Sequence, residues 1–125
     1  MTAATVDVNT SPDGTLILQP RGVLAAEDAI WLRRTLVRAI RHTRPLRLTL
    51  ELSCVQGLDP VNLGTLAAAY AIGDDHQVAV FFDHPSAYVA ELLTSAGVPR
   101  HRLRYIAQRF PVGLARGDTT RLTAE

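Results

Sequence analysis

The chain has 125 residues, 47% of them hydrophobic, which is enough for one domain with a single packed core. Its net charge of +1 gives no general attraction for nucleic acid or for an anionic membrane. All 13 basic residues are arginine, so enzymes that need a lysine base or a lysine Schiff base are excluded.

The cysteine content and the hydropathy of the chain indicate a cytoplasmic protein. Cys54 is the single cysteine, so no internal disulfide forms and a reducing compartment suits the protein. We expect Cys54 to be a small packing residue rather than a reactive thiol. Residues 1–10 lack the basic start and the apolar core of a secretory signal. No apolar run approaches the roughly 20 residues that cross a bilayer, so we expect no membrane insertion.

Two alternating segments predict a β-hairpin at the start of the chain. Residues 5–9 alternate around valines, and residues 15–19 form a second strand. Residues 11–14, Ser-Pro-Asp-Gly, supply the chemistry of a turn between them. Because proline has no N–H to donate, we expect Pro20 and Gly22 to end the pairing.

Apolar residues at helical spacing predict a helix from Glu27 to about Arg41 that lies on the sheet. Its buried stripe contains Ala29, Leu32, Leu36, Val37 and Ile40. Trp31 points away from this stripe, toward Arg34 and Arg38. Tryptophan and arginine are frequent in interface hot spots, so Trp31 is a candidate anchor for a partner. The alternative is a ring that folds flat over its own helix.

A change of period in the middle of the chain predicts a strand, a loop and a helix in succession. Leucines alternate with polar residues over residues 46–52, whereas apolar residues recur at helical spacing after residue 62. The loop from Val55 to Pro60 is expected at the exposed end of a central strand, where α/β sheets present their sites. Asp59 is predicted to cap the helix, with Pro60 in its first position, and Gly73 to end it.

The stretch from Glu51 to Gly64 resembles the signature of the STAS family, the domain of anti-sigma-factor antagonists and of sulphate-transporter tails. That signature runs roughly Asp-Leu-Ser-x-Val-x-x-Leu-Asp-Ser-Ser/Thr-Gly-Leu-Gly. The chain keeps Leu52, Ser53, Val55, Leu58, Asp59, Leu63 and Gly64. A second likeness lies at residues 22–24, which resemble a Gly-x-Leu-Asp step of the family with Ala25 in place of the acid. The resemblance covers about residues 15–106.

The resemblance implies that the usual phosphorylation site is lost. In the antagonists, the residue after the second aspartate is the serine that a partner kinase phosphorylates, and this chain has Pro60 there. Val61 and Asn62 follow where Ser/Thr and Gly are usual. Thr65 is disfavoured as a substitute acceptor because it lies about one turn inside the helix, where a phosphate gains less from the helix dipole. Ser53 is disfavoured because it is typical of a polar residue at a strand end.

The remaining third of the chain predicts a strand, a helix and a last strand. Residues 77–82 form an apolar run that indicates an interior strand, and Pro85 opens a helix. Residues 100–105 alternate, so the leucine and tyrosine should turn inward and the arginines toward water, where they protect an edge strand rather than bind nucleic acid. Residues 108–125 have no period and are expected to be partly disordered or a short helix.

The sequence offers no arrangement that is typical of an enzyme or a metal site. The four histidines, His42, His76, His84 and His101, have no metal-ligand spacing. Asp83, His84 and Ser86 are residue types of a catalytic triad, but neighbours in sequence rarely face one another. We therefore expect a protein that is not an enzyme and that has no cofactor and no metal.

These observations predict an α/β fold, a STAS-like mixed sheet of about five strands with helices packed against it, in the order β-β-α-β-α-β-α-β. Residues 1–107 are expected to form this domain. The resemblance implies a protein-binding regulatory module that docks an anti-sigma factor of the kinase fold, or another STAS protein. The candidate binding residues are Asp59, Pro60, Val61, Asn62, Leu63 and Trp31.

Two alternative functions remain open. One is a small STAS subunit of a lipid-transport ATPase complex, and the other is a ligand-sensing STAS domain. No nucleic-acid partner is expected, and a homodimer is compatible with the sequence.

Overall fold

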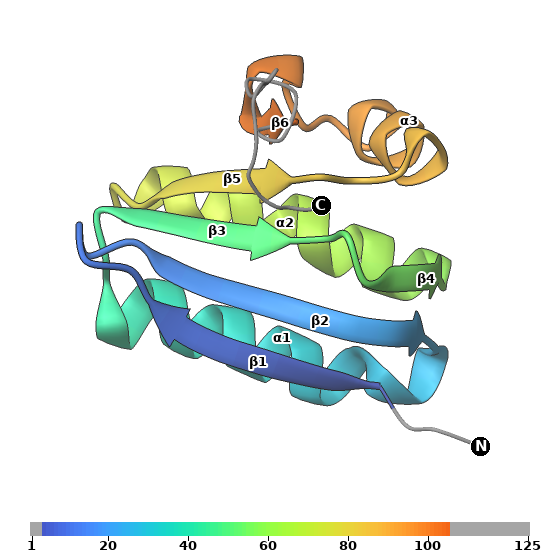
Figure 1. Cartoon of the computed structure of the whole chain (residues 1–125), viewed down its shortest axis with the longest axis horizontal. Coiled ribbons are helices and arrows are strands. Elements are labelled where there is room, and N and C mark those ends of the chain that lie inside the picture. The colour runs from blue at the N-terminus through green and yellow to red at the C-terminus, as the bar shows by residue number, and fades with distance from the viewer. Residues whose placement is uncertain (1–3, 106–125) are drawn as a thin grey trace, which may run out of the picture.

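A sheet of six strands with helices against it forms residues 4–105, the part of the chain that the computed structural model describes (Figure 1). The strands are β1 (Thr5–Thr10), β2 (Leu16–Leu24), β3 (Arg47–Glu51), β4 (Val55–Leu58), β5 (Ala79–Asp83) and β6 (Leu103–Arg104). The α-helices are α1 (Ala29–Arg38), α2 (Pro60–Asp75) and α3 (Ala87–Ser95). The short helical turns are η1 (Ala26–Asp28), η2 (Ala39–Thr43) and η3 (Arg100–Arg102). The predicted tail, residues 108–125, lies outside the described residues.

The strand order confirms the predicted fold class. The strands lie in the order β1-β2-β3-β5-β6, with β1 antiparallel to β2 and the other neighbours parallel. Helices α1 and α2 lie on one face of the sheet (Figure 1). This arrangement places β3 in the middle of the sheet, so the segment that follows it emerges at an end of the sheet, as expected.

The segment predicted as a loop from Val55 to Pro60 contains a short extra strand, β4. Strand β2 has 9 residues and β3 only 5, so the far end of β2 extends beyond β3 and has free backbone groups. The chain turns back after β3, with the Val55 N–H donating to the Leu52 carbonyl at 3.1 Å, and β4 then pairs with the end of β2 in parallel. The prediction from sequence missed β4 because the strand forms only by pairing with β2, about 30 residues away along the chain.

The prediction that Pro20 and Gly22 end the hairpin pairing is wrong for Pro20, because the pair Thr5 and Arg21 follows it. The pairing with β1 does stop before Gly22, although β2 itself continues to Leu24 beside β4. The Gly22 N–H donates to the Cys54 carbonyl at 2.9 Å, which is directed away from β1. Backbone direction alternates along a strand, so the nitrogen of Pro20 also points away from β1. Pro20 therefore removes no hydrogen bond from the hairpin.

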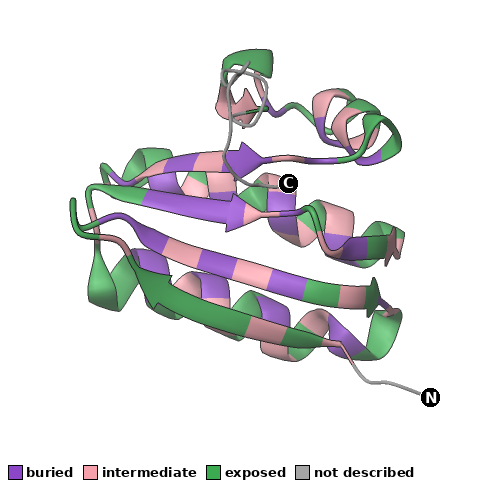
Figure 2. Cartoon of the chain, viewed as in Figure 1, coloured by how far each residue is buried: buried purple, intermediate pink, exposed green. Residues whose placement is uncertain are grey.

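The core lies between the sheet and helices α1 and α2 (Figure 2). In β3 the predicted inward leucines Leu48 and Leu50 are fully buried, but Thr49, expected on the wetter face, is buried as well, and Leu46 just before the strand is 84% exposed. The predicted helical stripe is confirmed by Leu32, Leu36 and Ile40, which are also buried. Each such side chain contributes about 1.5–3 kcal/mol by leaving water. Val89 and Leu93 of α3 extend the same core cluster.

Trp31 does not stand out from α1 as the helical spacing suggested. Its ring is half-buried and packs against the core, and its Nε1–H donates to Oδ1 of Asp28 at 2.8 Å. The other carboxylate oxygen of Asp28 accepts the Ala25 N–H at 2.9 Å. The ring thus folds over the start of its own helix and helps to hold the turn between β2 and α1.

Two helix ends differ from the predictions. Helix α3 begins at Ala87 rather than at Pro85, because the Ser86 hydroxyl accepts the Val89 N–H at 3.1 Å and caps the helix there. Helix α2 does not end at Gly73 but continues to Asp75. Gly73 is buried against β5, and its conformation is helical, so close packing rather than chain termination explains the glycine.

The buried side chain of Asn62 ties α2 to the turn that precedes α1. Asn62 is 0% exposed, and its Nδ2 donates to the Ala25 carbonyl oxygen at 2.7 Å. Its Oδ1 is buried and has no hydrogen-bond partner among the described residues. The side chain therefore makes one good bond across two segments that are far apart in sequence, and it bears the cost of one unsatisfied acceptor.

We predict that Gly73→Ala destabilises the protein although alanine favours helices. A Cβ at this position would lie 2.5 Å from Cγ2 of Val80 and 2.7 Å from the Val78 carbonyl oxygen. Such overpacking costs about 1–3 kcal/mol, which outweighs a gain of about 1 kcal/mol in helix propensity. The matched control is Gly64→Ala in the same helix, which meets nothing within 4 Å and should raise the free energy of unfolding. Urea denaturation of both variants measures the difference, and equal effects would contradict the packing argument.

We predict that Asn62→Asp destabilises the protein more at pH 7 than Asn62→Ala does. Alanine removes the bond to Ala25 and costs about 1–3 kcal/mol, whereas a buried carboxylate beside a carbonyl oxygen adds the cost of desolvating a charge. Burial favours the neutral carboxyl, which binds its proton more tightly in the folded than in the unfolded chain, so the stability of Asn62→Asp should rise as the pH falls. Asn62→Ala lacks the added titratable group. Denaturation curves from pH 7 to about 4 that shift in parallel for both variants would contradict this.

Candidate functional site

The start of α2 is the part of the structure in which the predicted binding residues gather. Asp59 is the N-cap, as predicted, and its Oδ1 accepts the Val61 N–H at 2.9 Å. Pro60 occupies the first turn, where its missing N–H costs nothing. The Asp59 N–H donates to the Leu24 carbonyl at 2.9 Å, which fastens the cap to the end of β2. Backbone and side-chain bonds thus hold this helix start in one conformation.

The five consecutive residues do not all face the solvent. Pro60 is exposed, and Val61 is 49% exposed. Leu63 is half-buried against the core, and Asn62 is fully buried. Only Pro60, Val61 and the edge of the Asp59 carboxylate are therefore placed to meet a partner directly, while Asn62 acts on their position from inside. Binding by these residues remains a prediction.

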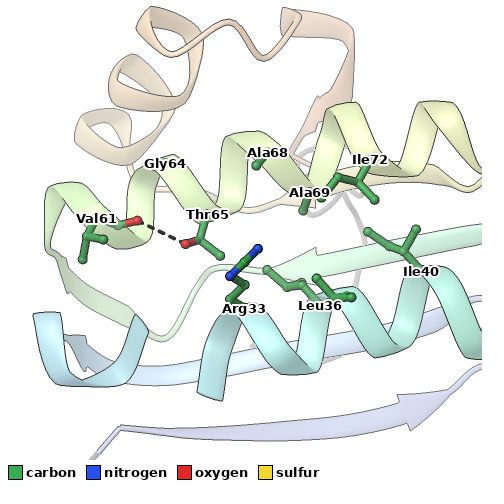
Figure 3. Close-up of a pocket in the computed structure, with 10 residues that line it drawn as sticks. Arg33, Leu36, Ile40, Val61, Gly64, Thr65, Ala68, Ala69 and Ile72 are labelled. Atoms are coloured by element: carbon green, nitrogen blue, oxygen red, sulfur yellow. Dashed lines mark hydrogen bonds between the residues drawn. The ribbon is translucent and has the colours of Figure 1, made fainter. Parts of the chain in front are cut away.

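A groove between α1 and α2 begins at Val61 and was not predicted from the sequence (Figure 3). It is lined by Arg33, Leu36, Val37, Ile40, Val61, Gly64, Thr65, Ala68, Ala69 and Ile72. Its volume is about 200 Å³, which is smaller than most pockets for drug-sized ligands and suits one or two side chains of a partner. The only sign of this groove in the sequence is the run of small residues on one face of α2. These residues indicate a groove only when α1 is known to lie opposite them.

The two hydroxyl groups considered as substitute phosphate acceptors lie in different settings. The Thr65 hydroxyl donates to the Val61 carbonyl at 3.2 Å inside the groove, so it is turned back onto its own helix. Ser53 is exposed in the turn between β3 and β4. Trp31 does not line the groove, and its indole N–H is already bonded to Asp28.

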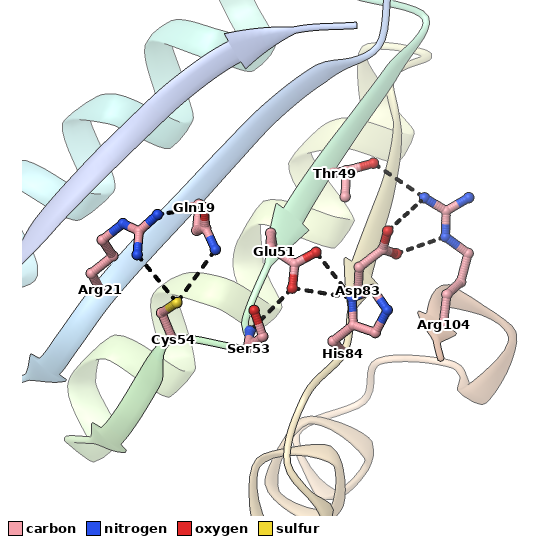
Figure 4. A network of polar contacts seen from close by, with 9 residues as sticks. All are labelled: Gln19, Arg21, Thr49, Glu51, Ser53, Cys54, Asp83, His84 and Arg104. Carbon is pink, nitrogen blue, oxygen red and sulfur yellow. Dashed lines mark hydrogen bonds and ion pairs between the residues drawn. The ribbon is translucent and has the colours of Figure 1, made fainter. Parts of the chain in front are cut away.

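The face of the sheet opposite the helices carries a polar network (Figure 4). Asp83 is buried, and its carboxylate binds the Arg104 guanidinium at 2.7 and 3.2 Å. Arg104 also reaches the Thr49 hydroxyl at 3.2 Å, and Nδ1 of His84 lies 3.0 Å from a carboxylate oxygen of Glu51. These contacts connect β3, β5 and β6 across the open face of the sheet, so the polar residues involved have a structural role.

The prediction that residues 100–105 turn their arginines to water and their tyrosine inward is only partly right. Arg100 is exposed as expected, but Tyr105 is 39% exposed, and Arg102 and Arg104 fold back over the sheet. Arg104 lies 4.2 Å from the centre of the Phe81 ring and Arg102 5.1 Å from it. Arg102 also donates to the Val80 carbonyl at 3.1 Å. A period of two could not reveal these contacts, because a two-residue strand at the edge of the sheet leaves long side chains free to fold back over it.

Cys54 lies in a polar setting rather than in the packed core where we expected it. It is half-buried, and its Sγ accepts hydrogen bonds from Nε2 of Gln19 and Nη1 of Arg21, both at 3.4 Å. Arg21 in turn donates to the Asp7 carboxylate at 2.6 Å, which raises the pKa of the guanidinium above its usual value. The cysteine thus joins the turn before β4 to β2 on the open face.

Residues 4–105 offer neither a metal site nor a helix that could cross a membrane. Within this range no three His, Cys, Asp or Glu side chains are grouped so that they could hold a metal ion. The helices of the described chain are all too short or too polar to cross a membrane.

Comparison with known proteins places the chain among domains of one family. The family model for the STAS domain matches residues 6–104. No curated protein sequence matches the chain. The fold is similar to the phosphorylated form of the Bacillus cell-fate determinant SpoIIAA, with a TM-score of 0.69 and 10% identity over 84% of this chain and 95% of that one.

Two further solved structures have similar folds and represent different settings of the domain. An anti-sigma factor antagonist from Mycobacterium paratuberculosis has a TM-score of 0.58 and 24% identity over 88% of this chain and 85% of that one. The STAS domain of a SulP transporter from Vibrio cholerae has a TM-score of 0.59 and 20% identity over 77% of each chain. The match of the family model over nearly all of the described residues, together with this fold, shows that the chain belongs to the STAS domain family.

Proposed function

We propose that the protein is a cytoplasmic binding module that acts as an anti-sigma-factor antagonist without a phosphorylation switch. It would dock a kinase-fold anti-sigma factor, or another STAS protein, through the start of α2. The observation that carries the proposal is the exposed pair Pro60 and Val61 on a helix start that is held in place and opens onto an apolar groove.

The chemistry of the helix start supports permanent binding competence. A phosphate on the residue after Asp59 would add nearly two negative charges beside an existing carboxylate and so change what the surface can bind. Pro60 has no hydroxyl, so that change is not available at this position. Val61 instead offers an apolar contact that does not depend on a kinase.

The rigidity of the helix start also favours a binding role. The Leu24 and Ala25 carbonyls hold Asp59 and Asn62, so the exposed residues between them need little ordering when a partner binds. A preformed surface loses less conformational entropy on association, which increases affinity for a given contact area. The groove beside it could accept an apolar side chain of the partner and has one cationic group, Arg33, on its wall.

A second candidate function is a subunit of a membrane transport complex, such as a lipid-transport ATPase. The likeness to the STAS domain of a SulP transporter favours it, because the same fold serves there as part of a transporter. The two candidates differ in the partner and not in the surface, so one binding experiment separates them.

We predict that Val61→Asp strongly weakens partner binding while the protein stays folded. A charge at an exposed apolar contact should weaken the complex by about tenfold or more, because the carboxylate must lose its water in the interface. The measurement is purification of the tagged protein from its own cells, with mass spectrometry of what co-purifies. Tyr88→Asp, at a residue 67% exposed on α3, is the matched control and should retain the partner.

Each outcome of this purification decides between the candidates. A kinase-fold anti-sigma factor that is lost from Val61→Asp and retained by Tyr88→Asp supports the antagonist. Transport subunits with the same pattern would replace it with the second candidate. Equal recovery from both variants would show that the start of α2 is not the binding surface.

We predict that Pro60→Ser makes the protein a substrate of the co-purified kinase, whereas the wild-type protein remains unmodified in the presence of ATP. The substitution places a hydroxyl at the position that resembles the family's phosphorylated serine, and serine is well tolerated at a helix start. Intact-mass measurement after incubation with ATP and the kinase detects the added phosphate. Phosphate on the wild-type chain, at Thr65 or Ser53 for example, would contradict a phosphorylation-blind antagonist.

A further inference from the structure

The outer edge of β1 is an unprotected strand edge. β1 is the terminal strand of the sheet, and β2 is its only hydrogen-bonded neighbour among residues 4–105. Edge strands are usually protected by lysine, proline, a bulge or a very short length. β1 has 6 residues, Thr-Val-Asp-Val-Asn-Thr, and pairs with β2 in unbroken register. Its one charged residue, Asp7, is engaged by Arg21 on the open face.

The register shows which backbone groups of β1 are open. The Gly22 N–H bonds away from β1, so the even-numbered residues of β2 direct their backbone away from the hairpin, and the odd-numbered ones direct it toward β1. Odd-numbered residues pair with odd-numbered residues in this hairpin, as in Asp7 with Gln19. The N–H and C=O groups of Val6, Val8 and Thr10 therefore point out of the sheet, where a further strand could bind them.

A groove with two arginines lies along this edge on the side of α1. It is lined by Val8, Leu16, Leu18, Arg34, Thr35, Arg38, Ala39 and Thr43. Val8 is 56% exposed, and its neighbours Leu16 and Leu18 form an apolar floor. Arg34 and Arg38 are exposed and form no ion pair with any other residue of the described chain. Their charges are therefore available to a partner.

We propose that this edge binds an extended segment of a partner protein that carries acidic and apolar side chains at alternate positions. The segment would add to the sheet as a strand beside β1, with its backbone bonded to Val6, Val8 and Thr10. Residues opposite each other in neighbouring strands point to the same face, so the side chains opposite these three would enter the groove. There they meet Val8 and the two arginines, which selects valine-like and acidic residues.

The open face of β1 determines which side chains the partner segment can have at its other positions. Asp7 and Asn9 alternate with Val8, and Asp7 pairs with Gln19, whose side chain lies on the open face of the sheet (Figure 4). Partner side chains beside them must be uncharged or basic, because a further carboxylate would face Asp7. This surface is formed by β1 and α1 and is separate from the start of α2, so a partner could occupy it while the proposed antagonist surface is also engaged.

A second copy of the chain fits the edge less well. Two β1 strands could pair around a two-fold axis, but Arg34 and Arg38 of both copies would then lie along the same seam. Neither helix brings an acidic residue to that groove to offset the four like charges. Charge complementarity therefore favours an acidic segment over self-association.

The test uses the full-length protein and two synthetic peptides. In the first peptide every other residue is threonine, and the residues between are glutamate, valine and glutamate in turn. The control peptide has lysine in place of each glutamate. Amide hydrogen exchange and chemical shifts are followed by NMR during titration. In the free protein, the Asp7 and Asn9 amides should be protected by β2, and those of Val6, Val8 and Thr10 should exchange fast. The glutamate peptide should slow the exchange of these three amides.

Charge-reversal variants distinguish peptide binding at Arg34 and Arg38 from a non-specific attraction of the acidic peptide to the basic helix α1. Arg34→Glu combined with Arg38→Glu should weaken binding of the glutamate peptide by about fivefold or more and strengthen binding of the lysine peptide. Arg33→Glu reverses a charge on the same helix but in the groove toward α2, and it should change the affinity by less than about twofold. Val61→Asp should also leave peptide binding unchanged, whatever its effect on the antagonist surface.

Three results would overturn the proposal. Equal binding of the two peptides, or no binding of the glutamate peptide, would show that the edge does not select acidic segments. An equal loss of affinity in Arg33→Glu would show a diffuse charge effect. If the Val6, Val8 and Thr10 amides are protected from exchange without peptide, and this protection grows with protein concentration, a second copy already occupies the edge.

Discussion

The connection between the end of β2 and the start of α2 determines how the candidate surface is presented. The Leu24 carbonyl holds the N-cap residue Asp59, and the Ala25 carbonyl holds the buried side chain of Asn62. The N–H of Ala25 is bound in turn by Asp28, whose second oxygen binds Trp31. The N–H and the carbonyl of Ala25 are therefore both hydrogen-bonded. Loss of this connection would leave buried polar groups unpaired and would release the helix start that carries Pro60 and Val61.

Four arginines of residues 4–105 illustrate two different physical roles. Arg21 and Arg104 bind carboxylates on the open face of the sheet, where they join strands. Arg34 and Arg38 lie on α1 and have no carboxylate partner within residues 4–105. Paired arginines on a surface contribute little to affinity for a partner, because their charge is already compensated, whereas unpaired ones attract acidic groups. A net charge of +1 conceals this division.

The two proposed surfaces use different kinds of recognition. The start of α2 offers a preformed apolar contact beside a groove, which suits a folded partner. The edge of β1 offers backbone groups and a charged groove, which suit an extended segment. A module with both could bring a folded protein and a flexible acidic tail together. Its binding would then be regulated by the supply of partners rather than by phosphorylation at Pro60.

Local chemistry made much of the fold and part of the candidate site predictable from the sequence. The buried leucines of β3, the helical stripe of α1 and the cap formed by Asp59 and Pro60 depend on neighbours a few residues apart, and the structure contains all three. Asn62 was predicted to contact a partner, but its side chain is fully buried, which the local pattern could not reveal. These features follow from backbone geometry and the period of burial, which a single segment already contains.

Tertiary structure alone decided the features that join distant segments. β4 exists because β2 is longer than β3, Gly73 is required because Val80 lies against it, and the Trp31 ring turns inward to bind Asp28. The groove beside Val61 and the unpaired arginines beside β1 arise only when α1 is placed between α2 and the edge of the sheet. The sequence determined which residues could be buried, capped or charged. Packing decided which of them meet, because contacts across the sheet depend on distances in space that no local period records.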